Sequence, residues 1–198
     1  MDTPIDRKYN AQNLKEVLPL LEGMEYFVFY GTLLGLVREG DILEKDDDID
    51  ILVDRKHFAE LIERFDKHDG LLTYDNNPNV NYCDFFRQAT CMRDDVKTFA
   101  DFYFYDTEIK PGSIVDRWNI HGSWNDPNMH IIIPNDIIYP IETKSNKKYG
   151  EINYPSQPTL CLEYLYGNGW MHPRKKKREY VQAIKNNRPH LVYLDQER

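Results

Sequence analysis

A short acidic segment carries the densest chemical signal in the sequence. Residues 46–53 read DDDIDILV, and their apolar members predict a buried strand. Side chains alternate along a strand, so Asp48 and Asp50 should share one face while Ile49 and Ile51 enter the core. Two carboxylates about 7 Å apart along a strand can share a divalent cation or hold a pair of them. Because oxygen-only ligands suit Mg²⁺ or Mn²⁺, the sequence predicts a metal site here.

A second element supports this prediction, since an isolated Asp-x-Asp is more often a solvated turn. Tyr30, Gly31 and Thr32 end one predicted strand and open a helix, where backbone N–H groups can bind an anion. Gly31 would let a phosphate approach closely, and the Thr32 hydroxyl would donate to it. A plain strand-to-helix turn is the alternative for Gly31. The bend and the aspartates together predict a phosphate-and-metal site.

A third carboxylate is expected from a later strand. Asp101 lies within the apolar segment TFADFYF, residues 98–104. A charge inside an apolar strand costs free energy unless it is paired or binds metal. A solvent-facing position at a strand edge is the alternative. As a ligand or a general base, Asp101 could accept the proton of an attacking hydroxyl.

The surrounding pattern predicts one domain that mixes helices and strands and ends in a C-terminal appendage. Apolar residues recur at helical spacing in some segments, and short aromatic or β-branched runs mark the strands. After Pro140 the chain is rich in proline and is expected to form loops. The predicted helices cover residues 11–22, 33–38, 56–67, 159–166 and 175–186, and the predicted strands cover residues 25–30, 48–54, 81–90, 98–105 and 131–133.

The composition argues against several classes of protein. The 198 residues are 41% hydrophobic and 29% charged, an ordinary globular balance. The net charge is −8, although residues 170–198 hold eight Lys or Arg against three Asp or Glu. An acidic body is a poor general binder of nucleic acid, and no apolar run is long enough to span a bilayer. With a polar start and three cysteines without metal-like spacing, a reduced, cytoplasmic protein is expected.

Three segments of the sequence carry a family resemblance: YGTLLGLVREGDIL with DDDIDI (residues 30–43 and 46–51), ADFYFYD (residues 100–106) and LEYLYGNGWMHP (residues 162–173). They resemble the LicD family, which together with the fukutin proteins belongs to the nucleotidyltransferase-fold superfamily. The first segment is specific and the other two are less so. This chain departs from the family at Glu44-Lys45, where members usually have a proline and an aromatic residue.

The resemblance implies an α+β fold, with a mixed sheet flanked by helices and a small C-terminal helical appendage. The implied division is a catalytic core over residues 1–155 and a helical extension over residues 156–198. Asp48, Asp50 and Asp101 would hold Mg²⁺ or Mn²⁺, and Gly31 and Thr32 would line the donor phosphates.

Further residues receive roles from the same resemblance. Arg38 would bind phosphate or stabilise a helix C-terminus, and Arg87 is a weaker phosphate candidate. Asp46 and Asp47 would support the loop or a second metal, and Asp106 would belong to a turn or support the site.

The function implied by the resemblance is the transfer of phosphocholine or a polyol phosphate from a CDP-linked donor to a glycan or glycolipid hydroxyl. A true nucleotidyltransferase, which uses an NTP and releases pyrophosphate, is one alternative. A non-catalytic nucleotide-binding partner subunit is another. The metal site is common to the two enzymes, so the sequence alone separates them poorly.

Other residues receive weaker predictions. The loop over residues 112–128, with Trp118 and Trp124, is the expected acceptor-side element. The basic segment RKKKR at residues 174–178 is expected to be a solvated helix face, with contact to an anionic glycan or a membrane surface as the alternative. Three histidines without paired spacing are expected to be structural: His121, His130 and His172.

Overall fold

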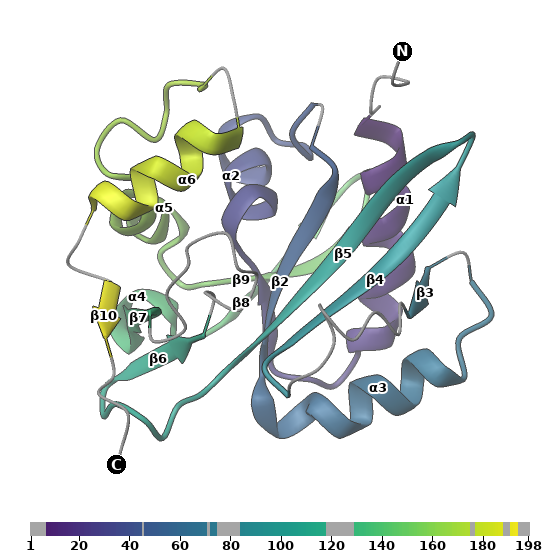
Figure 1. The fold of residues 1–198 in the computed structure, drawn as a ribbon, viewed down its shortest axis with the longest axis horizontal. Coiled ribbons are helices and arrows are strands. Elements are labelled where there is room, and N and C mark those ends of the chain that lie inside the picture. Colours follow the sequence, from purple (N-terminus) through teal and green to yellow (C-terminus); the bar gives the residue numbers. More distant parts are fainter. Residues whose placement is uncertain are drawn as a thin grey trace.

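The computed structural model describes residues 7–44, 46–70, 72–74, 84–117, 129–174, 177–187 and 191–193. Its helices and strands are mixed along the chain (Figure 1). The helices are α1 (Arg7–Val17), α2 (Tyr30–Arg38), α3 (Phe58–Asp66), α4 (Asn135–Ile138), α5 (Pro158–Tyr166) and α6 (Lys177–Asn186), with 3-10 helices at Leu18–Leu21 and Arg55–His57. The strands are β1 (Tyr26–Val28), β2 (Asp48–Asp54), β3 (Thr73–Tyr74), β4 (Phe86–Arg93), β5 (Val96–Tyr105), β6 (Ser113–Asp116), β7 (Met129–Pro134), β8 (Glu142–Asn146), β9 (Gly150–Tyr154) and β10 (Leu191–Tyr193).

The central sheet is mixed, and it has the strand order β1-β2-β5-β4-β3. β2 and β5 run parallel, whereas the other neighbouring pairs run antiparallel. The parallel register places Asp50 opposite Asp101 and Asp48 opposite Phe99. The predicted α+β class with a mixed sheet flanked by helices is confirmed.

One face of this sheet is covered by α1 and α3. The rings of Phe58 and Phe65 in α3 contact Phe104 and Phe102 in β5. In α1, Asn13 donates hydrogen bonds to the Thr98 hydroxyl and the Phe99 carbonyl, at 3.0 and 3.5 Å. Since side chains alternate along β5, Asp101 and Tyr103 face the other side of the sheet.

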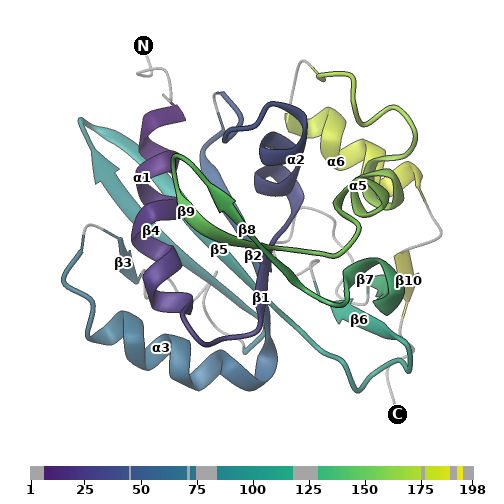
Figure 2. The same ribbon diagram turned by 180° about the vertical axis from the view of Figure 1, so that it is seen from behind.

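That other side carries the C-terminal elements. α5 packs on α2 and α6 packs on α5, and the three helices lie together in both views (Figures 1 and 2). A second sheet has the order β10-β7-β6, so the chain returns at β10 to pair with β7. The site therefore lies between the central sheet and the C-terminal helices.

Several expected segments differ from the structure. The expected loop over residues 112–128 contains the strand β6 at Ser113–Asp116. The second helix begins at Tyr30 rather than at residue 33, so Gly31 and Thr32 lie in its first turn. The region after Pro140, expected to form loops, contains the hairpin β8–β9 (Figure 2). Its outer strand β8 is polar, ETKSN, and gives little strand signal because most of it is exposed. No helix within the described residues is long and apolar enough to cross a membrane.

Candidate active site

The structure brings Asp48, Asp50 and Asp101 together on one face of the β2–β5 pair. Each offers a carboxylate oxygen, and these oxygens lie within 4.8 Å of one another. Asp50 and Asp101 are only 6% and 5% exposed, so their carboxylates are held inside the protein rather than on a solvated loop. The parallel register and the strand alternation together account for this convergence.

Neutral donors hold two of the three carboxylates in place. The Gly31 N–H donates to Asp50 Oδ2 at 2.9 Å, and the Tyr103 hydroxyl donates to Asp50 Oδ1 at 3.3 Å. The Gln88 amide donates to Asp101 Oδ1 at 2.8 Å from the neighbouring strand. Buried carboxylates need such hydrogen bonds, and these contacts fix the direction of each side chain.

Gly31 lines the cavity and has a role beside the predicted contact with a donor phosphate, which stays a prediction. A Cβ at this position would lie 2.8 Å from Asp46 Oδ2 and 3.0 Å from Asp50 Oδ2. The glycine therefore makes room for the two carboxylates of this chain, and its N–H is bonded to Asp50. The bend itself is tight, because the preceding Tyr30 has a φ of +41° in the left-handed region.

Thr32 differs from its predicted role. Its hydroxyl accepts a hydrogen bond from the Asp50 N–H at 2.8 Å, and the residue is 1% exposed. Thr32 does not line the cavity described below, so the predicted contact with a donor phosphate is replaced by a bond that joins α2 to β2.

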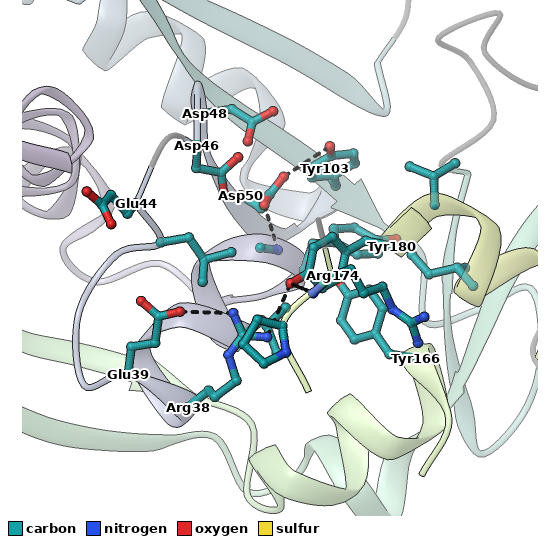
Figure 3. Close-up of a pocket in the computed structure, with 17 residues that line it drawn as sticks. Arg38, Glu39, Glu44, Asp46, Asp48, Asp50, Tyr103, Tyr166, Arg174 and Tyr180 are labelled. Atoms are coloured by element: carbon teal, nitrogen blue, oxygen red, sulfur yellow. Dashed lines mark hydrogen bonds and ion pairs between the residues drawn. The ribbon is translucent and has the colours of Figure 1, made fainter. Parts of the chain in front are cut away.

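A cavity of about 400 Å³ opens beside the carboxylates (Figure 3). Its first side, which we call the strand wall, consists of Asp46, Asp48, Asp50 and Tyr103. Its second side, the helical wall, consists of Tyr166, Arg174, Tyr180, Val181 and Ile184. Figure 3 shows the strand-wall aspartates grouped apart from Arg174, Tyr180 and Tyr166. The remaining lining residues are Tyr30, Gly31, Leu34, Arg38, Glu39, Leu43, Glu44 and Pro173.

The two predicted arginines have different positions. Arg38, the last residue of α2, lines the cavity and contacts the Glu39 carboxylate at 2.9 Å. Arg87 lies opposite Phe102 in the β4–β5 register, on the face away from Asp101, and its guanidinium lies 4.6 Å from the centre of the Phe58 ring. Arg87 is therefore outside this cavity, and its assignment as a phosphate ligand is corrected.

Other predicted residues are also placed. Asp46, Asp47 and Asp48 form a second group of neighbouring carboxylates, with ligand atoms within 4.8 Å of one another. Asp106 instead contacts Arg55 at 2.6 Å and Arg117 at 3.4 Å, and burial raises the pKa of its carboxyl. The expected acceptor-side tryptophans, Trp118 and Trp124, and His121 lie outside the described residues.

A buried pair behind the bend was missed from the sequence. The Tyr30 hydroxyl donates to Asp116 Oδ2 in β6, and Asp116 is completely buried. Burial raises the pKa of Asp116 to about 7, while the Tyr30 hydrogen bond offsets part of this effect. No local pattern connects two residues so far apart in the chain. The one available signal was a charge at the end of the apolar segment SIVD.

Tyrosine hydroxyls surround the carboxylates. Burial, with the negative charge of nearby carboxylates including Asp50, raises the pKa of the Tyr30, Tyr103 and Tyr166 hydroxyls well above its usual range. These hydroxyls are therefore neutral hydrogen-bond donors at physiological pH. Tyr103 could have been found from the sequence, because it lies two residues after Asp101 and shares its face.

The residues present fit a divalent cation. The ligand set consists of carboxylate oxygens from two adjacent strands, which suits Mg²⁺ or Mn²⁺. Gly31 leaves no side chain between Asp46 and Asp50, so both carboxylates can approach one point. Asp48, Asp50 and Asp101 are the residues that would hold the ion.

A comparison with known protein families identifies the family to which this domain belongs. Residues 23–145 match the family described as LicD/FKTN/FKRP, nucleotidyltransferase domain. The chain belongs to this family. The LicD match covers both aspartate strands and the Gly31 bend, and it identifies the domain as that of a nucleotide-related transferase.

Individual relatives are more distant. A "Niemann-Pick type C1-related protein" of Plasmodium falciparum (isolate 3D7) is 30% identical over 114 residues, which cover 53% of this chain and 7% of that protein. This LicD-family chain therefore spans a small part of the curated relative that it matches.

Two solved structures resemble the fold at low identity. The lincosamide antibiotic adenylyltransferase LnuA, solved with lincomycin bound, has a TM-score of 0.48 and 17% identity, covering 90% of this chain and 96% of its own. The antibiotic-resistance factor ANT(2'')-Ia has a TM-score of 0.46 and 10% identity, covering 91% and 83%.

Proposed function

We propose that this protein is a Mg²⁺- or Mn²⁺-dependent phosphotransferase. Its substrates would be a CDP-linked donor of phosphocholine or a polyol phosphate and a glycan or glycolipid hydroxyl. The convergence of Asp48, Asp50 and Asp101 beside a cavity that could admit a nucleotide carries this proposal. The LicD match supports the nucleotide-dependent part of it.

The three aspartates and the groups that hold them in place have separate roles. Asp48, Asp50 and Asp101 would hold the ion, which when bound would neutralise charge on the donor's diphosphate. Tyr103 and the Gly31 N–H keep Asp50 in position, and Gln88 does the same for Asp101. Because these hydrogen bonds within the fold already fix the direction of the carboxylates, little reorganisation would be needed during the reaction.

The proposed reaction is a single displacement at phosphorus. The oxygen of the acceptor hydroxyl forms a bond to the distal phosphorus of the donor, and the bond between that phosphorus and the oxygen of CMP breaks. Asp101 receives the hydroxyl proton, and CMP leaves with the bonding electron pair. The held orientation of Asp101 favours this assignment over one to Asp106, which is engaged by two arginines.

The experiment is a donor panel with product analysis. The purified chain is incubated with CDP-choline, CDP-ribitol or CDP-glycerol, an acceptor glycan and Mg²⁺, and CMP release is measured. We expect acceptor-dependent CMP release with one of these donors and none in EDTA. Failure of all three donors, with neither turnover nor Mg²⁺-dependent binding, contradicts the proposal. A thermal-shift screen of the same donors reports binding separately from turnover.

A true nucleotidyltransferase is the second candidate, because the matched family is described by its nucleotidyltransferase domain. Attack at the α-phosphate of an NTP would release pyrophosphate instead of CMP. Assaying both products from CTP and from CDP-linked donors separates the two reactions. Mg²⁺-dependent binding of nucleotide without any product would instead identify a non-catalytic binding subunit.

A further inference from the structure

Two arginines line the cavity at the side of Tyr180. Arg38 Nη1 donates to the Tyr180 hydroxyl at 3.3 Å and to the Trp170 carbonyl at 3.5 Å. The Arg174 backbone N–H donates to the same hydroxyl at 2.8 Å, and the Arg174 guanidinium lies 5.8 Å from the centre of the Tyr180 ring. One tyrosine of α6 therefore organises both cationic residues of the lining.

Both guanidinium groups keep an unused donor. The Nε atoms of Arg38 and Arg174 are buried, and neither has a hydrogen-bond partner within the part of the chain that the structure describes. The Arg38 side chain is only 7% exposed. A buried donor without a partner is costly, so a shift of either side chain that brings its Nε–H to a ligand oxygen would remove a penalty as well as form a bond.

The two arginines also differ in whether a carboxylate neutralises their charge. Arg38 is paired with Glu39, whereas Arg174 has no carboxylate within ion-pair distance among the described residues. The rest of the charged lining is acidic: Glu44, Asp46, Asp48 and Asp50. An anionic ligand that enters this cavity is repelled by the strand wall until a cation is present, and Arg174 offers it a positive charge on the opposite wall.

We propose that Arg38 and Arg174 form an anion subsite that binds a phosphate group of a nucleotide without a metal ion. The phosphate oxygens accept from the guanidinium N–H groups, and the nucleoside lies along the apolar part of the helical wall at Val181 and Ile184. Guanidinium groups suit this role because they present several N–H donors in one plane. The subsite deepens the function proposed above and rests on it for the choice of a cytidine nucleotide.

The test measures binding of CDP by isothermal titration, in EDTA and in Mg²⁺, with cytidine as the phosphate-free probe. Arg174→Gln removes one charge from the cavity. Arg178→Gln, at an exposed position of α6 that does not line the cavity, removes the same charge from the same segment. In EDTA we expect Arg174→Gln to weaken CDP binding about tenfold and Arg178→Gln to leave it within about twofold. Cytidine binding should not respond to either change.

Equal behaviour of the two variants in EDTA, or no CDP binding by the unaltered chain in EDTA, overturns the subsite. Asp48→Asn keeps this result separate from the proposed function. If Mg²⁺ tightens CDP binding, Asp48→Asn abolishes that gain and Arg174→Gln has no effect in EDTA, then the metal site stands and the anion subsite fails. If Arg174→Gln weakens binding in EDTA and Mg²⁺ adds nothing, then the subsite stands and the metal-dependent function fails.

Discussion

The strand wall reaches the cavity from two hydrogen-bonded strands, whereas the helical wall reaches it from α5, the following turn and α6. Asp50 of this wall lies opposite Asp101 in the backbone register, and hydrogen bonds of 2.9 and 2.8 Å fix the two side chains. Tyr180 is instead connected to the rest of the site by side-chain contacts with Arg38 and the Arg174 backbone. We infer that the strand wall sets the chemistry and that the helical wall sets affinity for the ligand.

The largest loss of activity is expected from a substitution of Asp48 in the strand wall. Asp48→Asn keeps the size of the side chain but removes a charged ligand oxygen, so turnover should fall on the order of a thousandfold. Folding should change little, because Asp48 is only half-buried. Steady-state CMP release gives the rate, and Asp66→Asn on the exposed side of α3 is the matched control. Full activity in Asp48→Asn removes the metal assignment.

The buried pair of Tyr30 and Asp116 can be tested through the pH dependence of stability. The Asp116 pKa is raised to about 7 in the folded protein, so its carboxyl binds a proton between about pH 4 and 7 that the unfolded chain does not. Stability from this group is therefore lost as pH rises through that window. Asp116→Asn removes the titration and still accepts from Tyr30. The unfolding free energy of the variant minus that of the unaltered chain should therefore be about 2 to 3 kcal/mol larger at pH 8 than at pH 5.

Urea unfolding of both proteins at the two pH values provides this comparison, because contributions from other groups cancel in the difference. An equal difference at pH 5 and pH 8 would show that Asp116 does not titrate in this range. Tyr30→Phe removes the hydroxyl that donates to Asp116 and should raise the Asp116 pKa further.

A smaller effect is expected at Gly31. Alanine is compatible with a helical backbone, but its Cβ would meet the Asp46 and Asp50 carboxylates at 2.8 and 3.0 Å. The carboxylates must shift, so affinity for Mn²⁺ should fall about tenfold to a hundredfold with little loss of stability. Gly169→Ala is the control, since a Cβ there has no neighbour within 4 Å among the described residues. Unchanged Mn²⁺ binding in Gly31→Ala would show that the carboxylates do not converge at this glycine.

The same contrast explains what the sequence could predict. Asp48 and Asp50 were predicted from a period of two within six residues, and Asp101 from one charge in an apolar strand. Each of these patterns lies within a single strand, so it can be recognised without knowing the fold. The pairing of the two strands then brings the aspartates together. The role of Gly31 in making room for Asp46 and Asp50 was missed, because these carboxylates come from residues 15 and 19 positions later in the chain.

The helical wall could not be predicted in this way. Tyr166, Arg174 and Tyr180 are ordinary residues of a helix and a basic turn, and their place in the cavity depends on how α5 packs against α2. The prediction for Arg87 was wrong for a related reason. Its residue type suited phosphate, but the β4–β5 register turns it to the Phe58 side of the sheet, whereas its neighbour Gln88 faces Asp101.

The mildest change tests whether the helical wall acts on affinity alone. Tyr180→Phe keeps the ring beside Tyr166 and removes the hydroxyl that accepts from Arg38 and from the Arg174 N–H. One net hydrogen bond of this kind contributes about 1 kcal/mol, so CDP binding should weaken about fivefold while the maximal rate stays nearly unchanged. Arg178→Gln is the control, because Arg178 is an exposed residue of the same helix and does not line the cavity. If Tyr180→Phe lowers the maximal rate and leaves KM unaltered, then α6 acts on the transition state, and the division of labour between the two walls is wrong.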